Sequence, residues 1–250
     1  MILMMLGAQG TGKGTVAGIL SEKTGWPQIS TGDIFRKYIA EQTELGIEAN
    51  KYIAAGNLVP DEITVPMVKA RLEEEDAKEG AILDGFPRTI AQAEALDKIL
   101  AEQNRKVDLV INLTTPREEI ITRILNRRVC SNQKCKATYN LTMHPSKVEG
   151  ICDKCGATLK QREDDSNEES IRTRLNIYDE KTRPLVEFYE KKGVITTQEV
   201  SEKINRLGQD VAEDVYKMLN KWPFGDGVKK GQVNLYGTGL KKGYMSHAHF

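Results

Sequence analysis

The sequence predicts an α/β fold in which a parallel sheet is flanked by helices on both faces. Short apolar segments alternate with stretches of helical periodicity, which is typical of a parallel sheet covered on both sides. A glycine-rich loop directly behind the first apolar segment indicates a strand, a turn and a helix in succession. Two segments interrupt the alternation, one at residues 30–65 and one at 129–163, and we expect both to be insertions.

Five segments are predicted to form the strands of this sheet, because each is short, apolar and bounded by turn residues or a helical stretch. They are residues 2–6, 28–29, 81–83, 107–113 and 194–197. The first helix is predicted at residues 15–24, with Gly25 as its C-terminal stop.

Three prolines predict where later helices begin or break. The Thr-Pro-Arg-Glu segment at 115–118 is expected to start a helix, with its threonine as the cap and its proline in the first turn. Pro66 predicts a helix that begins at Thr64 and not at Asp61, since proline is tolerated only near a helix start. Pro184 is predicted to break or bend the long helix that contains it.

The composition is that of an ordinary soluble globular protein, with 39% hydrophobic and 29% charged residues in a chain of 250. Its 36 basic side chains balance 36 acidic ones, so bulk attraction to nucleic acid or to an anionic membrane is not indicated. No apolar run approaches the roughly 20 residues that span a bilayer. A strand that starts at residue 2 leaves no space for a signal peptide. We therefore expect a cytoplasmic protein without membrane association.

The segment at residues 7–15, GAQGTGKGT, is predicted to bind phosphate groups. Such a turn between a strand and a helix points backbone N–H groups and the positive helix end into one concavity, and Lys13 adds an ammonium group. Gly14 stands where the general pattern has a metal-binding hydroxyl, and Thr15 follows one residue late. A glycine-rich turn that only connects two elements would not explain a lysine between two glycines at this spacing.

A second motif, Asp84-Gly85-Phe86-Pro87-Arg88, follows the third predicted strand. Ligands gather beyond the carboxyl ends of parallel strands, so Asp84 is expected beside the phosphate loop. A carboxylate there suits Mg²⁺, directly or through water. Arg88, on a stiff Gly-Phe-Pro turn, is suited to clamp a phosphate. A turn or cap role for Asp84 is less favoured, because asparagine or serine would serve as well.

Four cysteines are clustered as Cys130-x4-Cys135 and Cys152-x2-Cys155. Thiols stay reduced in the cytoplasm, so this cluster predicts metal ligands before disulfides. Two knuckles with a turn-rich stretch between them suit four thiolates around a structural Zn²⁺ with no open position. The alternatives are a disulfide pair and a nucleic-acid-binding zinc ribbon.

Together these motifs resemble those of the adenylate kinases, over residues 1 to about 218. The elements that carry the resemblance occur in the order of that family. They are the phosphate loop, Gln28-Ile29-Ser30-Thr31-Gly32-Asp33, the motif from Asp84 to Arg88 with Thr89 and Gln92 behind it, and Arg127-Arg128-Val129. The resemblance implies reversible, Mg²⁺-dependent transfer of a phosphoryl group from ATP to AMP, which gives two ADP.

The resemblance also implies a domain organisation. A parallel-sheet core would comprise residues 1–29, 66–121 and 165–219, a nucleoside monophosphate (AMP) binding insertion residues 30–65, and a zinc-bearing lid residues 122–164. Closure of the lid over both nucleotides would exclude water and suppress hydrolysis.

The site residues follow from the same resemblance. ATP would be bound by Gly10, Thr11, Gly12, Lys13, Gly14, Thr15, Arg123 and Arg127. AMP would be bound by Thr31, Arg36, Leu58, Val59, Gly85, Arg88, Gln92, Arg162 and Arg174. The cations that stabilise the transferred group would be Lys13, Arg88, Arg127, Arg162 and Arg174. Asp84 would hold Mg²⁺ through water, and Cys130, Cys135, Cys152 and Cys155 would hold Zn²⁺.

Arg123 and Arg127 are four positions apart, which predicts that they share a face of the helix that begins near residue 115. The alternative for Arg123 is a plain surface ion pair with Glu119. An arginine cluster directly before a metal-ligand loop favours the phosphate-binding interpretation, most clearly for Arg127.

Other functions remain open from the sequence. The same chemistry could act on UMP or CMP, or a phosphate loop and a zinc ribbon could form a nucleotide-dependent switch or RNA-binding module. That module predicts a basic surface and no acceptor site. Residues 220–250, rich in glycine and lysine, are predicted to be a flexible tail, with contact to RNA or a partner as the alternative. We expect a monomer that binds ATP and AMP and no specific nucleic acid.

Overall fold

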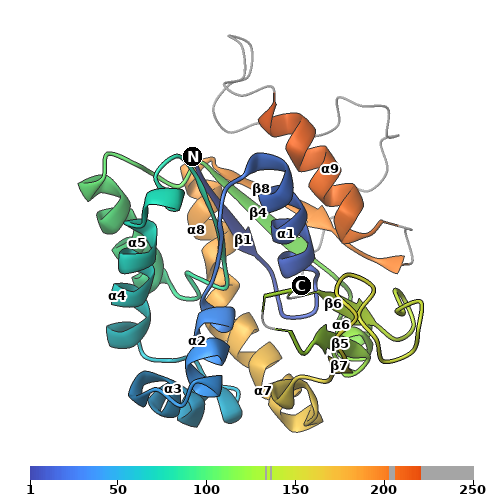
Figure 1. Ribbon diagram of the computed structural model, residues 1–250. Coiled ribbons are helices and arrows are strands. Elements are labelled where there is room, and N and C mark those ends of the chain that lie inside the picture. Colours follow the sequence, from blue (N-terminus) through green and yellow to red (C-terminus); the bar gives the residue numbers. More distant parts are fainter. Residues whose placement is uncertain (133, 136, 203–205, 221–250) are drawn as a thin grey trace, which may run out of the picture.

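The computed structural model describes residues 1–132, 134–135, 137–202 and 206–220. The predicted tail therefore lies outside the described residues from position 221 on. Within the described part, the core is a five-stranded parallel sheet with the strand order β2-β3-β1-β4-β8 and helices on both faces (Figure 1). The strands are β1 (Ile2–Leu6), β2 (Gln28–Ser30), β3 (Ala81–Asp84), β4 (Leu109–Thr114) and β8 (Ile195–Glu199). The predicted α/β fold and its five core strands are confirmed, with strand ends shifted by one or two residues.

The helices continue the alternation that the sequence indicates. They are α1 (Lys13–Thr24), α2 (Thr31–Ala40), α3 (Glu44–Ala54), α4 (Asp61–Leu72), α5 (Ile90–Glu102), α6 (Arg117–Leu125), α7 (Glu168–Ile177), α8 (Pro184–Lys192) and α9 (Gly208–Leu219), with short 3₁₀ turns at Glu75–Ala77 and Glu163–Asp165. Gly25 closes α1 in the left-handed region at φ 75°, as predicted. No helix among the described residues is long and apolar enough to cross a membrane.

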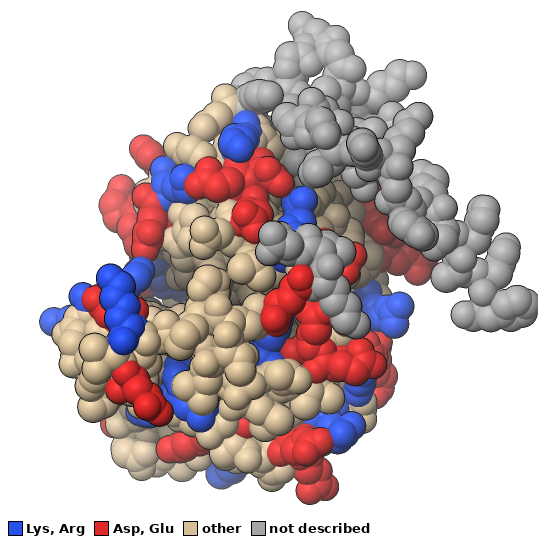
Figure 2. All heavy atoms as spheres, turned by 90° about the vertical axis from the view of Figure 1, so that its right-hand side faces the viewer, with Lys and Arg blue, Asp and Glu red and all other residues tan. Residues whose placement is uncertain are grey.

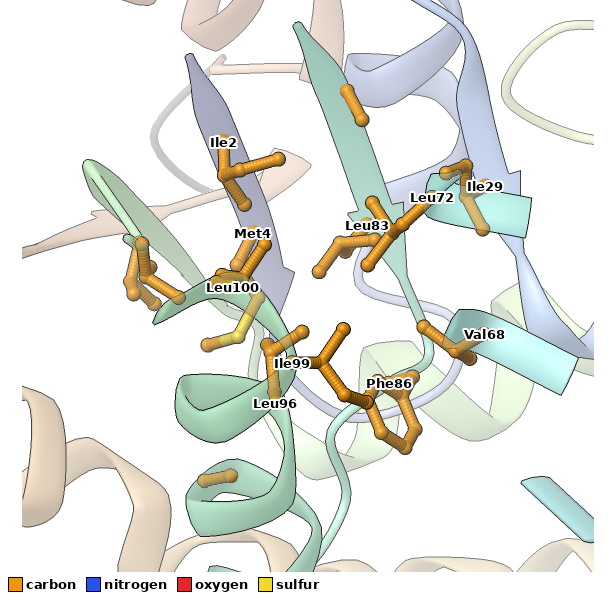
Figure 3. Packing of buried hydrophobic residues seen from close by; sticks show 14 of the residues in the cluster. Ile2, Met4, Ile29, Val68, Leu72, Leu83, Phe86, Leu96, Ile99 and Leu100 are labelled. Carbon is orange, nitrogen blue, oxygen red and sulfur yellow. The ribbon is translucent and has the colours of Figure 1, made fainter. Parts of the chain in front are cut away.

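Strand β1 divides the core into two layers, because successive side chains of a strand point to opposite faces. Ile2 and Met4 pack against α4, α5 and α8, and Figure 3 shows them opposite Leu96 and Leu100 of α5. Leu3 and Met5 face the other way, against α1 and α9. The sheet is thus buried on both faces, which fixes the positions of its carboxyl ends.

Two smaller units lie beyond those carboxyl ends. Helices α2 and α3 share a separate apolar cluster made of Phe35, Ala49 and Val59. Across the molecule, β5 (Arg127–Cys130) pairs antiparallel with β6 (Thr138–Asn140) and β7 (Leu159–Lys160). Figure 1 shows α2 and α3 at the lower left and the β5–β7 sheet at the lower right, both below the strands of the core. The three short strands are absent from the sequence prediction, because their register is set by partners distant in the chain.

A helix does start within residues 115–118, as predicted, but the cap predicted at Thr115 is wrong. The helix cap is Pro116, whose backbone is extended at ψ 139°, so α6 begins at Arg117. The Thr115 hydroxyl instead donates to the carbonyl oxygen of Val200 at 2.7 Å. The Thr115 side chain thus bonds to the residue that follows strand β8 and does not cap α6.

The predicted start of α4 is also wrong, since the helix begins at Asp61 and contains Pro66 in its interior. The amides of Ile63 and Thr64 donate to the Pro60 carbonyl oxygen, so the first turn is already helical. The one backbone bond that Pro66 removes would join it to Glu62, and both residues are exposed. Solvent can therefore satisfy the freed carbonyl.

The interruption predicted at Pro184 is confirmed. Helix α7 ends at Ile177, a π-helical turn spans Tyr178–Thr182, and Pro184 opens α8 at its first position. Proline is tolerated there because the first helical N–H groups need no partner within the helix.

Candidate active site

The loop at residues 7–12 joins β1 to α1 and has the geometry of an anion cradle. Gly7 has φ 134°, and a Cβ atom there would lie 2.4 Å from the Leu113 carbonyl oxygen, so only glycine fits. Gly12 caps α1 in the left-handed region with φ 95°. The open N-terminus of α1 therefore presents its free N–H groups to the loop.

Lys13 is the first residue of α1, and its Nζ donates to the Ala8 carbonyl oxygen across the loop at 2.7 Å. Burial lowers the pKa of Lys13 to about 8; Asp84 opposes this shift, while Arg88 and Arg127 add to it. Burial thus disfavours the charged form of the Lys13 amine, and a bound anion would stabilise that form.

A cleft of about 1320 Å³ opens from this loop between the core, α2 and α3, and the β5–β7 sheet. Single small-molecule pockets span roughly 300–1,000 Å³, so the space exceeds what one such ligand needs. All but one of the site residues predicted from the nucleotide-binding motifs line it. They are Gly10, Gly12, Lys13, Gly14, Thr15, Thr31, Arg36, Leu58, Val59, Asp84, Gly85, Arg88, Gln92, Arg123, Arg127, Arg162 and Arg174.

Thr11 is the exception. Its side chain is buried, and its hydroxyl donates to the Ala8 carbonyl oxygen at 2.8 Å. It shapes the loop from behind and does not line the cleft.

Asp84 ends β3 beside the phosphate loop, as parallel topology predicts. Its carboxylate accepts a hydrogen bond from Gln28 Nε2 at 3.1 Å. A Cβ atom on Gly14 would lie 3.6 Å from Asp84 Oδ2, so the carboxylate faces the start of α1. This oxygen donor next to an anion cradle is the kind of ligand that Mg²⁺ prefers.

Arg88 and Gln92 form one hydrogen-bonded unit. Arg88 Nε donates to the Gly85 carbonyl oxygen at 2.8 Å, and the Arg88 N–H donates to Gln92 Oε1 at 2.7 Å. Gln92 Nε2 donates to Asp61 Oδ1 at 2.6 Å. The Asp61 carboxylate can only accept a hydrogen bond, and the Arg88 backbone N–H can only donate one. The two contacts therefore define which end of the Gln92 side-chain amide is oxygen and which is nitrogen.

Two carboxylates that sequence reasoning missed hold the arginines of the cleft. Arg127 makes a bidentate pair with the fully buried Asp165, at 2.7 Å for each bond. Arg174 Nη1 contacts Asp164 Oδ2 at 2.8 Å. The signal was the run Arg162-Glu163-Asp164-Asp165, in which acidic residues directly follow a predicted phosphate-binding arginine.

The charges in this part of the cleft perturb one another. Burial alone would raise the pKa of Asp164, but Arg174, Arg36 and Arg162 outweigh it and hold that pKa below its ordinary value. Burial lowers the pKa of Arg162 to about 10, and the neighbouring Arg127 and Arg36 contribute to the shift. Cations crowded in this way are stabilised by any polyanion that enters.

Arg123 differs from its prediction in two respects. Its helix ends at Leu125, and Arg127 opens strand β5, so the two arginines do not share a helix face. Pairing of Arg127 with Asn140 of β6 requires an extended backbone, which overrides the helical period. The alternative pair with Glu119 does form, at 3.3 Å, but it is buried and not on the surface.

The four cysteines are brought together despite the longer first knuckle. Their sulfur atoms all lie within 4.8 Å of one another, and all four cysteines are free. Cys130 and Cys155 Sγ are 3.4 Å apart, and Cys135 and Cys152 Sγ are 3.6 Å apart. Four thiolates about 2.3 Å from a tetrahedral Zn²⁺ lie roughly 3.8 Å from one another, so this cluster has the size of a metal site. The disulfide alternative is not observed.

Comparison with known proteins decides the family. The sequence profile of the family described as "Adenylate kinase" matches residues 5–194. The chain is 49% identical over 219 residues to the adenylate kinase of Caldicellulosiruptor saccharolyticus, a match that covers 88% of this chain and 99% of that protein. The adenylate kinase of Staphylococcus aureus is 48% identical over 220 residues, with the same two coverages. That of Archaeoglobus fulgidus is 48% identical over 211 residues, which covers 84% of this chain and 96% of that protein. The chain belongs to the adenylate kinase family.

Membership of the adenylate kinase family identifies the chain as a nucleotide-binding phosphotransferase. Family members of this kind transfer a phosphoryl group from ATP to AMP, which gives two ADP, and the cleft described above has room and cations for both nucleotides. Kinases that act on UMP or CMP are not favoured by these matches.

Proposed function

We propose that this chain interconverts ATP plus AMP with two ADP in the single cleft that joins the phosphate loop to Arg36 and Arg88. The observation that carries the proposal is this shared cleft, in which the loop and the second pair of cations face one space. A nucleotide switch needs one phosphate site only, whereas a phosphotransferase between nucleotides needs a donor side and an acceptor side.

On the donor side, we assign the ATP phosphates to the loop and the N-terminus of α1. The residues assigned there are Gly10, Gly12, Lys13, Gly14, Thr15, Arg123 and Arg127, with Thr11 supporting the loop from behind. Bound Mg²⁺ would neutralise charge on the phosphate oxygens, and Asp84 would hold it through water.

On the acceptor side, we assign the AMP phosphate to Arg36 and Arg88. The nucleoside would contact Thr31, Leu58, Val59, Gly85 and Gln92. The Gln92 amide already bonds to Asp61 and to the Arg88 N–H, yet it keeps a second N–H and a second lone pair. Those two groups are complementary to the N1 acceptor and the exocyclic amine of adenine.

Transfer of the phosphoryl group needs alignment and charge neutralisation more than covalent help. We assign the neutralising role to Lys13, Arg88, Arg127, Arg162 and Arg174. Asp164 and Asp165 would keep Arg174 and Arg127 oriented before the nucleotides arrive. Arg127 uses its Nε and Nη2 atoms to bind Asp165, so its other N–H groups would meet phosphate oxygens while this pair is kept.

We also propose a domain organisation for the chain. Residues 1–29, 66–121 and 165–219 would form the core, residues 30–65 the AMP-binding insertion, and residues 122–164 a lid whose closure excludes water. The lid would hold Zn²⁺ through Cys130, Cys135, Cys152 and Cys155, since the sulfur separations suit that ion. We propose a monomer in the cytoplasm, in keeping with four free thiols.

The experiment that tests this function supplies ATP and Mg²⁺ with AMP, UMP, CMP and GMP in turn. AMP is expected to be converted to ADP at a far higher kcat/KM than any other acceptor. If no monophosphate is phosphorylated, the kinase function is wrong; if UMP or CMP is the better acceptor, the assignment of the adenine contacts is wrong.

The RNA-binding alternative predicts a basic surface. The face of the molecule on the right of Figure 1 carries acidic and basic side chains interspersed, as Figure 2 shows. The chain as a whole has 36 of each, and this balance supports a small anionic substrate over a nucleic acid.

Replacement of Arg88 by alanine is expected to impair AMP more than ATP. Loss of charge-assisted hydrogen bonds to a phosphate costs about 1.5–3 kcal/mol, which corresponds to roughly 10- to 150-fold in the KM for AMP. The KM for ATP should change by less than about twofold. Arg172→Ala is the matched control, because Arg172 lies on exposed α7 surface and pairs with Glu168. Equal losses for both nucleotides in Arg88→Ala would contradict the acceptor-side role.

A further inference from the structure

The π-helical turn between α7 and α8 places the Thr182 side chain in the protein interior. Of the residues Tyr178–Thr182, only Thr182 is buried, and it is 6% exposed. The Tyr178 carbonyl oxygen accepts from the Arg183 N–H at 2.8 Å, five positions along the chain. The wider turn therefore displaces Thr182 from the position that a continuous α-helix would give it.

The Thr182 hydroxyl makes an unusual contact for a helical threonine. Such hydroxyls commonly donate to the carbonyl four residues earlier, as Thr122 does to Glu118 at 3.2 Å. Thr182 instead donates to the Arg88 carbonyl oxygen at 2.9 Å, across 94 positions of the chain. The contact joins the α7–α8 segment to the loop that follows strand β3.

This bond completes the restraint of Arg88. The Arg88 N–H is fixed by Gln92 and its Nε by the Gly85 carbonyl, so the Thr182 hydroxyl supplies the third point, at the Arg88 carbonyl. A guanidinium group that must meet a phosphate depends on a fixed backbone, because displacements of about 1 Å cost large factors in rate. Thr182 also lines the cleft itself.

We propose that Thr182 is a positioning residue for Arg88, and through Arg88 for the phosphate of the acceptor nucleotide. The proposal rests on the assignment of Arg88 to AMP made above. The same continuous segment carries Arg174 on α7, so the contact ties the position of Arg88 to the helix that bears a second cation of the cleft. The π-helical turn therefore does more than accommodate Pro184, because it also places the Thr182 hydroxyl against the Arg88 carbonyl oxygen.

The test compares Thr182→Val, which is nearly isosteric but cannot donate, with Thr182→Ser, which keeps the hydroxyl. Thr182→Val is expected to raise the KM for AMP about tenfold and to change the KM for ATP by less than twofold, since one buried hydrogen bond is lost. Thr182→Ser is expected to restore the KM for AMP to within about twofold of the unmodified chain. Should the valine variant not fold, Thr182→Ala gives the same comparison.

Thr196→Val is the matched control. Thr196 is also buried, at 7% exposed, and its hydroxyl accepts from Gln198 Nε2 in strand β8, away from the cleft. It is expected to lower the melting temperature without the selective change in KM. An unchanged KM for AMP in an active Thr182→Val enzyme, or equal rises for ATP and AMP, would overturn the proposal. Failure of the proposed function itself would show separately, as no ADP formation by the unmodified chain.

Discussion

Lys13→Met is expected to lower turnover by at least about 10²- to 10³-fold while the fold is retained. We propose that this ammonium group faces the transferred phosphoryl group, and removal of one preorganised charge in such a position costs factors of this size. The methionine side chain keeps the length and the apolar contacts of the lysine stem. Steady-state kinetics and the circular dichroism spectrum measure the two parts of the expectation.

The matched control is Lys23→Met on the same helix. Lys23 pairs with Glu213 at 2.7 Å on the surface, outside the cleft, so its loss should leave turnover within about twofold. Comparable losses in the two variants would indicate a general effect of removing charge from α1 and would contradict the role of Lys13.

The lowered pKa of Lys13, about 8, adds a dependence on pH. A bound triphosphate stabilises the charged amine and raises its pKa, so above pH 8 the binding of ATP must take up a proton. The affinity for ATP should therefore fall as the pH rises from 8, by at most about tenfold per pH unit, and Lys13→Met should lack this contribution.

The same shift also bears on stability. Between pH 8 and the ordinary pKa of 10.5, the unfolded chain binds more protons at this lysine than the folded chain does. Lys13 therefore destabilises the fold at neutral pH, and this penalty is relieved as the pH rises through 8. Lys13→Met is accordingly expected to melt no lower than the unmodified chain at pH 7, which separates lost chemistry from lost structure.

The sequence predicts those parts of the site that depend on local pattern and sheet topology. The loop before Lys13 could be predicted from the sequence because its backbone angles at three positions favour glycine. Asp84 and Arg88 could be placed beside the loop because parallel strands end at one edge of the sheet. The cysteine spacing predicted one cluster, and the sulfur atoms do converge.

Contacts between distant segments were not predictable in the same way. Asp165 meets Arg127 across 38 positions, and Thr182 meets Arg88 across 94. Arg127 itself leaves the helical period because strand β6 offers it a partner. Thr115 likewise exchanges a local cap for the Val200 carbonyl, so single-segment reasoning fails where a tertiary hydrogen bond competes with a local one.

Removal of zinc is expected to unfold the lid and leave the core intact. Among the described residues of 126–162, the only buried apolar side chains are Cys130 and Cys152. A three-stranded sheet of this size has no apolar core of its own, so we expect its folding to depend on the metal. A zinc-selective chelator, used with Mg²⁺ in excess, should release about one Zn²⁺ per chain and produce an early melting transition.

Removal of the metal should also lower turnover at least about tenfold, because the proposed lid carries two of the cations that we assign to phosphoryl transfer. Arg127 opens β5, and Arg162 follows β7. Cys130→Ser should reproduce the effect, whereas Ser131→Ala, the loss of one hydroxyl at the next position, should not. Limited proteolysis should cut the zinc-free lid between residues 131 and 160 while α1, α5 and α9 stay protected, since their apolar clusters contain no lid residue. Reduced protein that contains no zinc and melts unchanged with chelator would instead mean that the four thiols hold the lid through their own packing.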